Sequence, residues 1–224
     1  MRLSVIVPVL DEATIIGGLV SRLAPDVHEV VVADGGSVDG TADLAAAAGA
    51  KVVTGARGRG AQMDAGARAA TGDVLWFVHA DTTLPPGAAL AVRHAAHEAP
   101  WGCFAVRVES MDPRLRWCGR YMTARARRLG SATGDMAIWV RREAFFAAGG
   151  FGTRDICEDL ALTDRLRGQA PPRVIALRVG TSARRWQQEG VTRTMLRMWA
   201  VRGGYRLGLP PGWLVPLYRG RPRD

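Results

Sequence analysis

Cysteine, lysine and long apolar runs are all scarce in this sequence of 224 residues. The three cysteines, Cys103, Cys118 and Cys157, are odd in number and lack the paired spacing of a metal site, which favours a reducing cytoplasm. Since no run of about eighteen apolar residues occurs, we expect no membrane-spanning helix. The opening MRLSVIVPVLDEA turns acidic too soon for a signal peptide, and a strand begins there directly.

Lysine is nearly absent, because Lys51 is the only one, yet the chain carries 30 basic and 21 acidic residues, a net charge of +9. The excess positive charge is therefore almost entirely guanidinium, which grips phosphate with two parallel hydrogen bonds. This favours acidic partners such as nucleotides or anionic lipid, although the base composition of the gene explains an arginine excess equally well. Nucleic acid is not an expected partner.

The first eighty residues alternate between apolar strand-like runs and helical patterns. We expect strands at 3–9, 29–33, 51–54 and 73–78 and helices at 13–23, 40–48 and 59–70. This alternation predicts an α/β domain with a mostly parallel sheet. Pro8 marks the point where pairing of the first strand should stop. The strand ends at Asp34 and at Val78–His79 should lie along one edge of the sheet, where ligands bind.

The second half is less regular. We expect helices at 86–96 and 114–129, strands at 103–109 and 173–179, a strand running into a short helix and a Gly-Gly turn over 136–151, and a helix opened by Glu158 and Asp159. No linker or repeat divides the chain, which predicts one domain over 1–224. It would comprise a nucleotide-binding half (about 1–100), an acceptor half (about 101–181) and a helical tail (about 182–224).

Polar groups at the predicted sheet edge suggest a nucleotide-type site. Asp34 ends a buried strand and is followed by Gly35 and Gly36, which let a ligand approach the backbone closely. Asp81 follows the strand DVLWFV, and the loop GARGRG is basic and rich in glycine. That loop lacks the Lys-Ser/Thr ending of a phosphate loop and the pattern of a dinucleotide fold. A flexible basic turn explains it as well as a phosphate contact does.

Five segments, taken in order, resemble a known enzyme family. They are SVIVPVLDEA, VVVADGGSVDGT, GRGAQMDAGARAATGDVLWFVHADT, GDMAIWVRREAFFAAGGF and CEDLALTDRLR. Their order and separation resemble family-2 glycosyltransferases, above all a short single-domain bacterial subgroup, over about Leu3 to Leu166. The resemblance implies the GT-A fold, a mostly parallel sheet flanked by helices with a C-terminal helical tail, and a nucleotide-sugar donor.

The resemblance also implies donor contacts. Asp34 would accept a hydrogen bond from the nucleobase, and Arg59 would contact the phosphates. The remaining donor-side residues implied are Pro8, Leu10 and Glu12 in the base and ribose pocket, Gln62, Asp64 and Gly66 in the segment that passes along the donor, and Arg185. For Gln62 and Asp64, ordinary capping of a helix N-terminus is the competing interpretation.

Asp81 stands where the family has an Asp-x-Asp motif that holds a divalent metal, Mg²⁺ or Mn²⁺, against the diphosphate. Here the motif is His79-Ala80-Asp81, without the first acid. One or two carboxylates with substrate phosphates are enough for Mg²⁺. His79 would be an extra ligand or a ribose contact, and a packed, hydrogen-bonded histidine is an equally good interpretation.

Glu158-Asp159 matches the Glu-Asp pair that supplies the family's general base for inverting transfer, with Asp159 preferred as the base and Glu158 as its neighbour. Acids in a first helical turn also suit the helix dipole, which needs no catalytic role. Gly134-Asp135 matches a pair that borders the acceptor site. Relatives often have glutamine next, whereas this chain has Met136.

The tail allows two interpretations. Arg184, Arg185 and Trp186 fit a lid over the diphosphate or a basic surface turn with one anchoring aromatic. Further on, aromatic residues alternate with arginines, which suits an anionic membrane surface or a helix docked on the core. These residues are Trp199, Tyr205, Trp213 and Tyr218.

The sequence therefore predicts a metal-dependent inverting glycosyltransferase that moves a sugar from a nucleotide-diphosphate sugar, a UDP-sugar by preference, to an acceptor hydroxyl. The acceptor is unidentified, lipid-linked or small. The expected location is cytoplasmic, with peripheral contact to the inner membrane face through the tail. Two alternatives compete: a sugar nucleotidyltransferase, and a non-catalytic protein of this fold that binds anionic lipid or nucleic acid.

Overall fold

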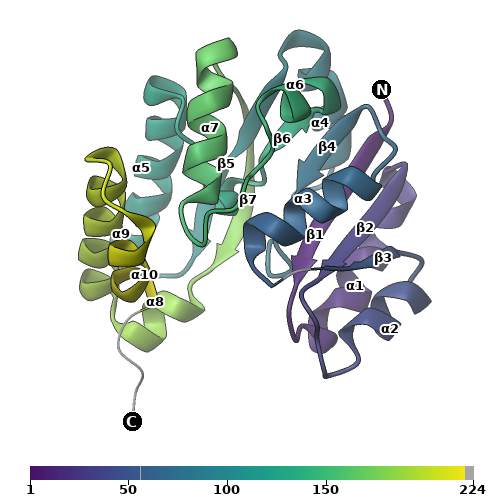
Figure 1. Cartoon of the computed structure of the whole chain (residues 1–224), viewed down its shortest axis with the longest axis horizontal. Helices are drawn as coiled ribbons and strands as arrows, with labels where there is room; N and C mark the ends of the chain where they lie inside the picture. Colours follow the sequence, from purple (N-terminus) through teal and green to yellow (C-terminus); the bar gives the residue numbers. More distant parts are fainter. Residues whose placement is uncertain (56, 220–224) are drawn as a thin grey trace.

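The computed structural model describes residues 1–55 and 57–219, without the side chains of Arg185 and Arg219 (Figure 1). Its centre is a seven-stranded sheet of order β3-β2-β1-β4-β6-β5-β7. Only β6 runs antiparallel to its neighbours, so the mostly parallel sheet predicted from the sequence is confirmed. The strands are β1 (Leu3–Val9), β2 (Glu29–Asp34), β3 (Lys51–Thr54), β4 (Val74–Phe77), β5 (Trp101–Glu109), β6 (Trp139–Arg141) and β7 (Arg173–Ser182).

Helices cover both faces of the sheet, and Figure 1 shows α3 and α7 on the near face. The tail helices α8, α9 and α10 gather beside α5, at the opposite end of the molecule from α1 and α2. The helices are α1 (Ala13–Leu23), α2 (Thr41–Ala47), α3 (Arg59–Ala69), α4 (Ala88–Glu98), α5 (Pro113–Leu129), α6 (Arg142–Ala147), α7 (Glu158–Gln169), α8 (Arg184–Glu189), α9 (Val191–Arg206) and α10 (Pro211–Arg219), with short 3₁₀ turns η1 (Ala24–Asp26) and η2 (Gly134–Met136).

The end of β1 differs from the expectation in one respect. Pairing with β4 stops after Ile6, but pairing with β2 continues past Pro8 to Val9, which lies opposite Asp34. The prediction that pairing stops at Pro8 is therefore wrong for the β2 side. This register places the ends of β1 and β2 side by side at the predicted ligand edge.

Several boundaries in the second half shift for local reasons. Gly87 adopts a left-handed conformation (φ 74°), so α4 begins at Ala88 and not at Pro86. Both β5 and β7 are longer than predicted, because they pair in parallel from Gly102–Arg173 through to Glu109–Ser182. The tail helices consequently begin at Arg184.

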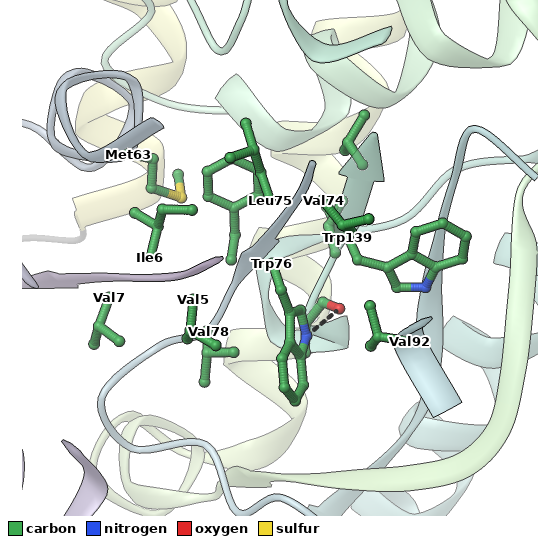
Figure 2. Close-up of a cluster of buried hydrophobic side chains, with 14 of the residues drawn as sticks. Val5, Ile6, Val7, Met63, Val74, Leu75, Trp76, Val78, Val92 and Trp139 are labelled. Atoms are coloured by element: carbon green, nitrogen blue, oxygen red, sulfur yellow. Dashed lines mark hydrogen bonds between the residues drawn. The ribbon is translucent and has the colours of Figure 1, made fainter. Parts of the chain in front are cut away.

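The core lies on both sides of β4, whose four residues are all buried (Figure 2). Trp76 donates its indole N–H to the carbonyl oxygen of Ala137 at 3.2 Å, and Trp139 of β6 is fully buried nearby. The short strand β6 is thus fixed against β4 by packing as well as by backbone pairing. It carries the chain from Gly134 and Asp135 back into the sheet.

The tail is docked on the body of the protein, one of the two arrangements considered from the sequence. Ile156, Val201 and Leu214 form a small buried cluster, and Tyr205 donates a hydrogen bond to Asp164 at 2.9 Å. Among the described helices, none combines the length and apolar character needed to cross a membrane. Residues 220–224, the predicted basic end, lie outside the described part.

Candidate active site

A cavity of about 360 Å³ lies between the N-terminus of α7, the loop before β6, α5 and the tail. One side of it is polar, with Arg59, His79, Asp135, Glu158 and Asp159 among the lining residues. The other side, formed mainly by α5 and the tail, is largely apolar and aromatic. The residues there include Tyr121, Met122, Ile156, Trp186, Met195, Met198, Trp199 and Tyr218.

The two acids predicted as catalytic open α7 and both line the cavity. Cys157 directly before them is in a left-handed conformation (φ 58°), which is unusual for a residue other than glycine. Glu158 is only 7% exposed. Burial, and then the neighbouring charge of Asp159, raises the pKa of Glu158 to about 7. This carboxyl is therefore suited to exchange a proton near neutral pH.

Asp159 is held in a fixed orientation by backbone donors. Its Oδ2 accepts a hydrogen bond from the N–H of Gly134 at 2.9 Å, and its Oδ1 accepts one from the N–H of Leu160 at 2.7 Å. The structure thus joins two motifs that are 25 residues apart in the chain. A Cβ atom at position 134 would lie only 2.6 Å from Cε1 of the His79 ring. This close approach therefore requires glycine.

Arg59 at the start of α3 lies among the acids of the cavity. Crowding by the surrounding protein lowers its pKa, but attraction by Tyr218, Glu158, Asp135 and Asp159 more than compensates, so the pKa is raised. Arg59 is exposed, and its guanidinium stays positively charged beside these acids, where it is available to an anionic ligand.

His79 follows β4, and its Nδ1 atom lies 3.9 Å from Oδ1 of Asp135. The same oxygen accepts a hydrogen bond from the hydroxyl of Thr181. Burial, followed by repulsion from Arg59, lowers the pKa of His79, so the ring is neutral at pH 7. Its Nε2 atom is buried and has no hydrogen-bond partner among the described residues. The ring edge with Cε1 and Nε2 faces Gly134, so the structure places His79 as a packed residue of the cavity wall.

Asp81 is exposed in the turn after β4 and does not line the cavity. It is close enough to Glu12 to raise the pKa of that carboxyl, after the larger effect of burial, while Arg184 acts in the opposite direction. Glu12, Asp81 and Arg184, which follow β1, β4 and β7, therefore lie near enough to influence one another's charge. Within the described residues, no group of three or more His, Cys, Asp or Glu side chains converges on one point.

Asp34 is buried at the end of β2, and its carboxylate shapes the following turn. Oδ1 accepts hydrogen bonds from the N–H of Gly36 (2.9 Å), the N–H of Ser37 (2.8 Å) and the hydroxyl of Ser37 (2.8 Å). Oδ2 has no such partner in the described part of the chain. Pro8, of intermediate burial, and Leu10, which is exposed, lie at the end of β1 beside it.

Gln62 and Asp64 bond to the backbone within the fold. Gln62 donates its amide N–H groups to the carbonyl oxygens of Val9 (2.6 Å) and Ala33 (3.0 Å), which joins the ends of β1 and β2. Asp64 accepts hydrogen bonds from the N–H groups of Phe151 (2.8 Å) and Gly152 (3.1 Å). Neither side chain lines the cavity, so a donor role for either stays a prediction.

Most of the apolar wall of the cavity has no signal in the sequence. Met122 of α5 and Met195 and Met198 of α9 line this wall, whereas the sequence indicates only the aromatic residues of the tail. Trp186, predicted as part of a lid, lines the cavity and packs against the cluster of Val108, Leu115 and Ala183. The backbone of Arg185 lies in α8, but its side chain is outside the described part, as is all of Ala56 in the loop GARGRG.

Comparisons with known proteins agree with this architecture. No curated protein matches the chain. A solved mycobacterial protein is 21% identical with a TM-score of 0.54, over 81% of this chain; the chain spans 65% of its length. A second solved structure is glucosyl-3-phosphoglycerate synthase from Mycobacterium tuberculosis, in complex with Mn²⁺, UDP and glucosyl-3-phosphoglycerate. It is 22% identical to this chain with a TM-score of 0.61, and the match covers 93% of this chain and 81% of the synthase.

Mannosyl-3-phosphoglycerate synthase from Rubrobacter xylanophilus is 19% identical with a TM-score of 0.55, over 85% of this chain and 75% of its own. These likenesses confirm the GT-A fold. The model of glycosyl transferase family 2 matches residues 4–160, which include the ends of β1, β2 and β4 and both acids of α7. The chain belongs to glycosyl transferase family 2, and it is a glycosyltransferase.

Proposed function

We propose that the protein transfers a sugar from a nucleotide-diphosphate sugar, most simply a UDP-sugar, to an acceptor hydroxyl with inversion at the anomeric carbon. The observation that carries this proposal is the fixed carboxylate of Asp159, held by the N–H of Gly134 at the polar end of the cavity that Arg59 also lines. Family membership and a solved structure of this fold that holds UDP and Mn²⁺ support it.

Asp159 acts as the general base. It accepts the proton of the acceptor hydroxyl while that oxygen forms its bond to the anomeric carbon. The bond from the anomeric carbon to the phosphate oxygen breaks on the opposite face, and the nucleoside diphosphate leaves with the electron pair. Arg59 stabilises the charge that develops on the diphosphate. Glu158, whose pKa is raised to about 7, lies beside Asp159 and contacts the acceptor.

The donor nucleoside binds at the ends of β1 and β2. The second oxygen of Asp34 accepts a hydrogen bond from the nucleobase, and Pro8, Leu10 and Glu12 border the base and ribose. Arg185 belongs to the proposed contacts of the diphosphate, as predicted from the sequence. Gly134 and Asp135 border the acceptor, consistent with their place in the cavity lining.

A divalent ion, Mg²⁺ or Mn²⁺, belongs to this proposal, and Asp81 would hold it together with the donor phosphates. The residues fit such an ion, because the exposed Asp81 and the nearby Glu12 supply the carboxylate oxygens that Mg²⁺ prefers. When bound, the ion supplies positive charge that stabilises the leaving diphosphate.

The acceptor is lipid-linked or a small molecule, and we expect the protein to work in the cytoplasm without nucleic acid as a partner. Contact of the tail with the inner membrane face is part of the proposal, because Trp213 is 73% and Leu207 82% exposed. Side chains of this kind are common where proteins meet lipid.

Titration calorimetry with UDP, in the presence and absence of Mn²⁺, tests the function. Tight binding that depends on the metal is expected, together with UDP release from a UDP-sugar. Asp81→Ala should remove most of the metal-dependent gain in affinity, about tenfold or more, and His79→Ala should have a smaller effect. A non-catalytic binder of anionic lipid would show neither the metal dependence nor UDP release, and equal affinities in both variants would refute the metal site.

A further inference from the structure

The outer face of α5 carries an unusual density of positive charge. Its 17 residues include six arginines and no acid. Leu115, Cys118, Gly119 and Ala126 turn inward and are buried. The side chains of Arg116, Arg120, Arg127 and Arg128 are exposed.

These arginines border a second cavity, a groove of about 1030 Å³ between α5, β5 and β7. The floor is apolar and includes Val106, Val108 and Ala124. Among the described residues that line the groove, Glu109 is the one acid. The guanidinium groups along it belong to Arg107, Arg116, Arg120, Arg127, Arg128 and Arg178.

The charges of this groove are not neutralised within the described part of the protein. Arg107 has Glu109 at 3.8 Å, but the other five arginines form no ion pair or hydrogen bond with described residues. Like charges gathered on one surface repel each other, which the fold tolerates most easily if an anionic partner supplies the opposite charge.

Partly exposed aromatic side chains lie on the same helix, next to the arginines. Trp117 is 49% exposed and stacks on Tyr121, with the two ring centroids 5.5 Å apart. The ring centroid of Trp199 on α9 lies 6.3 Å from the centroids of both rings. Tyr121 and Trp199 also line the catalytic cavity, so they form its mouth on this side. The apolar end of that cavity therefore opens on the arginine-bearing face, where α5 and α9 lie side by side (Figure 1).

We propose that this face, made of the exposed arginines of α5 and the rim of Trp117, Tyr121 and Trp199, docks on an anionic lipid bilayer. Arginines pair with lipid phosphates, while tryptophan and tyrosine sit at the boundary between headgroups and acyl chains. The role of this docking, to bring the apolar mouth of the cavity to a membrane-borne acceptor, rests on the function proposed above.

A bilayer fits the surface better than a soluble polyanion does. Leu196 of α9 is 59% exposed near the aromatic rim, and the groove between the arginines has an apolar floor. A polyanion would need the arginines but would gain little from exposed aliphatic side chains. A lipid surface satisfies both at once.

Sedimentation with vesicles tests the docking. We expect the protein to bind vesicles of phosphatidylcholine with phosphatidylglycerol, and not phosphatidylcholine alone, with affinity that falls as salt rises. Arg120→Glu with Arg127→Glu should reduce binding by about tenfold or more. The matched control is Arg22→Glu with Arg68→Glu, exposed residues of α1 and α3 with the same change in net charge, which should change binding only slightly. Equal losses in both pairs, or no binding to anionic vesicles, would overturn the proposal.

Trp117→Ala separates a bilayer from a polyanion. It should weaken vesicle binding several-fold while leaving any binding of inorganic polyphosphate, a polyanion without apolar or aromatic groups, unchanged, and thermal melts exclude unfolding. Vesicle binding that is indifferent to Trp117 would assign the face to a soluble polyanion instead. UDP release without vesicles, measured on the same preparations, reports the proposed transferase separately, so either proposal can fail alone.

Discussion

At the ends of β1 and β2, Asp34 and Gln62 each bond to two or more groups of the fold, and Asp64 of α3 bonds to two N–H groups of the loop after α6. Around the cavity, by contrast, His79 Nε2 and Thr133 Oγ1 are buried without a partner among the described residues, and the pKa of Glu158 is raised. Native proteins satisfy nearly all buried polar groups unless a ligand or a catalytic role explains the exception. Polar groups of the first region therefore hold the fold together, whereas those around the cavity retain bonding capacity that a substrate could use.

Replacement of the base should give the largest effect. Asp159→Asn keeps an oxygen for the N–H of Gly134 but cannot accept the acceptor proton, so we expect the rate to fall about 10²–10⁴-fold. The measurement is UDP release under donor saturation, with UDP affinity and thermal melts as controls. Glu158→Gln should cost less. Wild-type turnover in Asp159→Asn would remove this residue from the mechanism, and a dead Glu158→Gln with an active Asp159→Asn would exchange the two roles.

Asp34 holds the turn after β2 and is also proposed to bind the nucleobase. Asp34→Asn separates these two roles. The amide oxygen can still accept the three hydrogen bonds of the turn, whereas the amide nitrogen replaces the oxygen proposed to face the nucleobase. We expect UDP to bind about tenfold or more weakly, with the melting temperature unchanged. An unchanged Kd with a lower melting temperature would make Asp34 a turn residue alone.

Asp64 should behave as one of the groups that hold the fold together. Asp64→Ala leaves the N–H groups of Phe151 and Gly152 without their acceptor, which should lower the free energy of unfolding by about 1–3 kcal/mol. Urea denaturation measures this loss, and calorimetry should show little change in UDP affinity. If affinity fell while stability held, Asp64 would be the donor contact predicted from the sequence.

Glu158 should leave a pH signature. Because its pKa is raised in the folded protein, the folded state binds more protons than the unfolded state between pH 4.5 and about 7. Stability should therefore decrease as pH rises through this window, by on the order of 1–3 kcal/mol. Glu158→Gln should flatten that part of the profile. If the free energy of unfolding changed with pH equally in the wild type and in Glu158→Gln, the raised pKa would be contradicted.

The sequence predicts the first half of the fold well, because its signals are local. The bounds expected for β1, α1 and β3 are those found, since each rests on an apolar period that a neighbouring turn ends. The left-handed Cys157, which aims Glu158 and Asp159 into the cavity, has no such signal. Likewise, no pattern in the tail shows that Met195 and Met198 face α5, because that orientation depends on the docking of α9.

Strand β6 has a further consequence, for the order of folding. It is three residues long and is the one strand that joins β4 to β5 in the described sheet. Its pairing with β4 brings together residues 63 to 67 positions apart, a loop whose closure must be completed before the pairing is gained. Until Trp139–Arg141 arrive, β4 is an open edge and the halves cannot share one core. Completion of the sheet is therefore expected to be a late step, and amide exchange at β6 should report it.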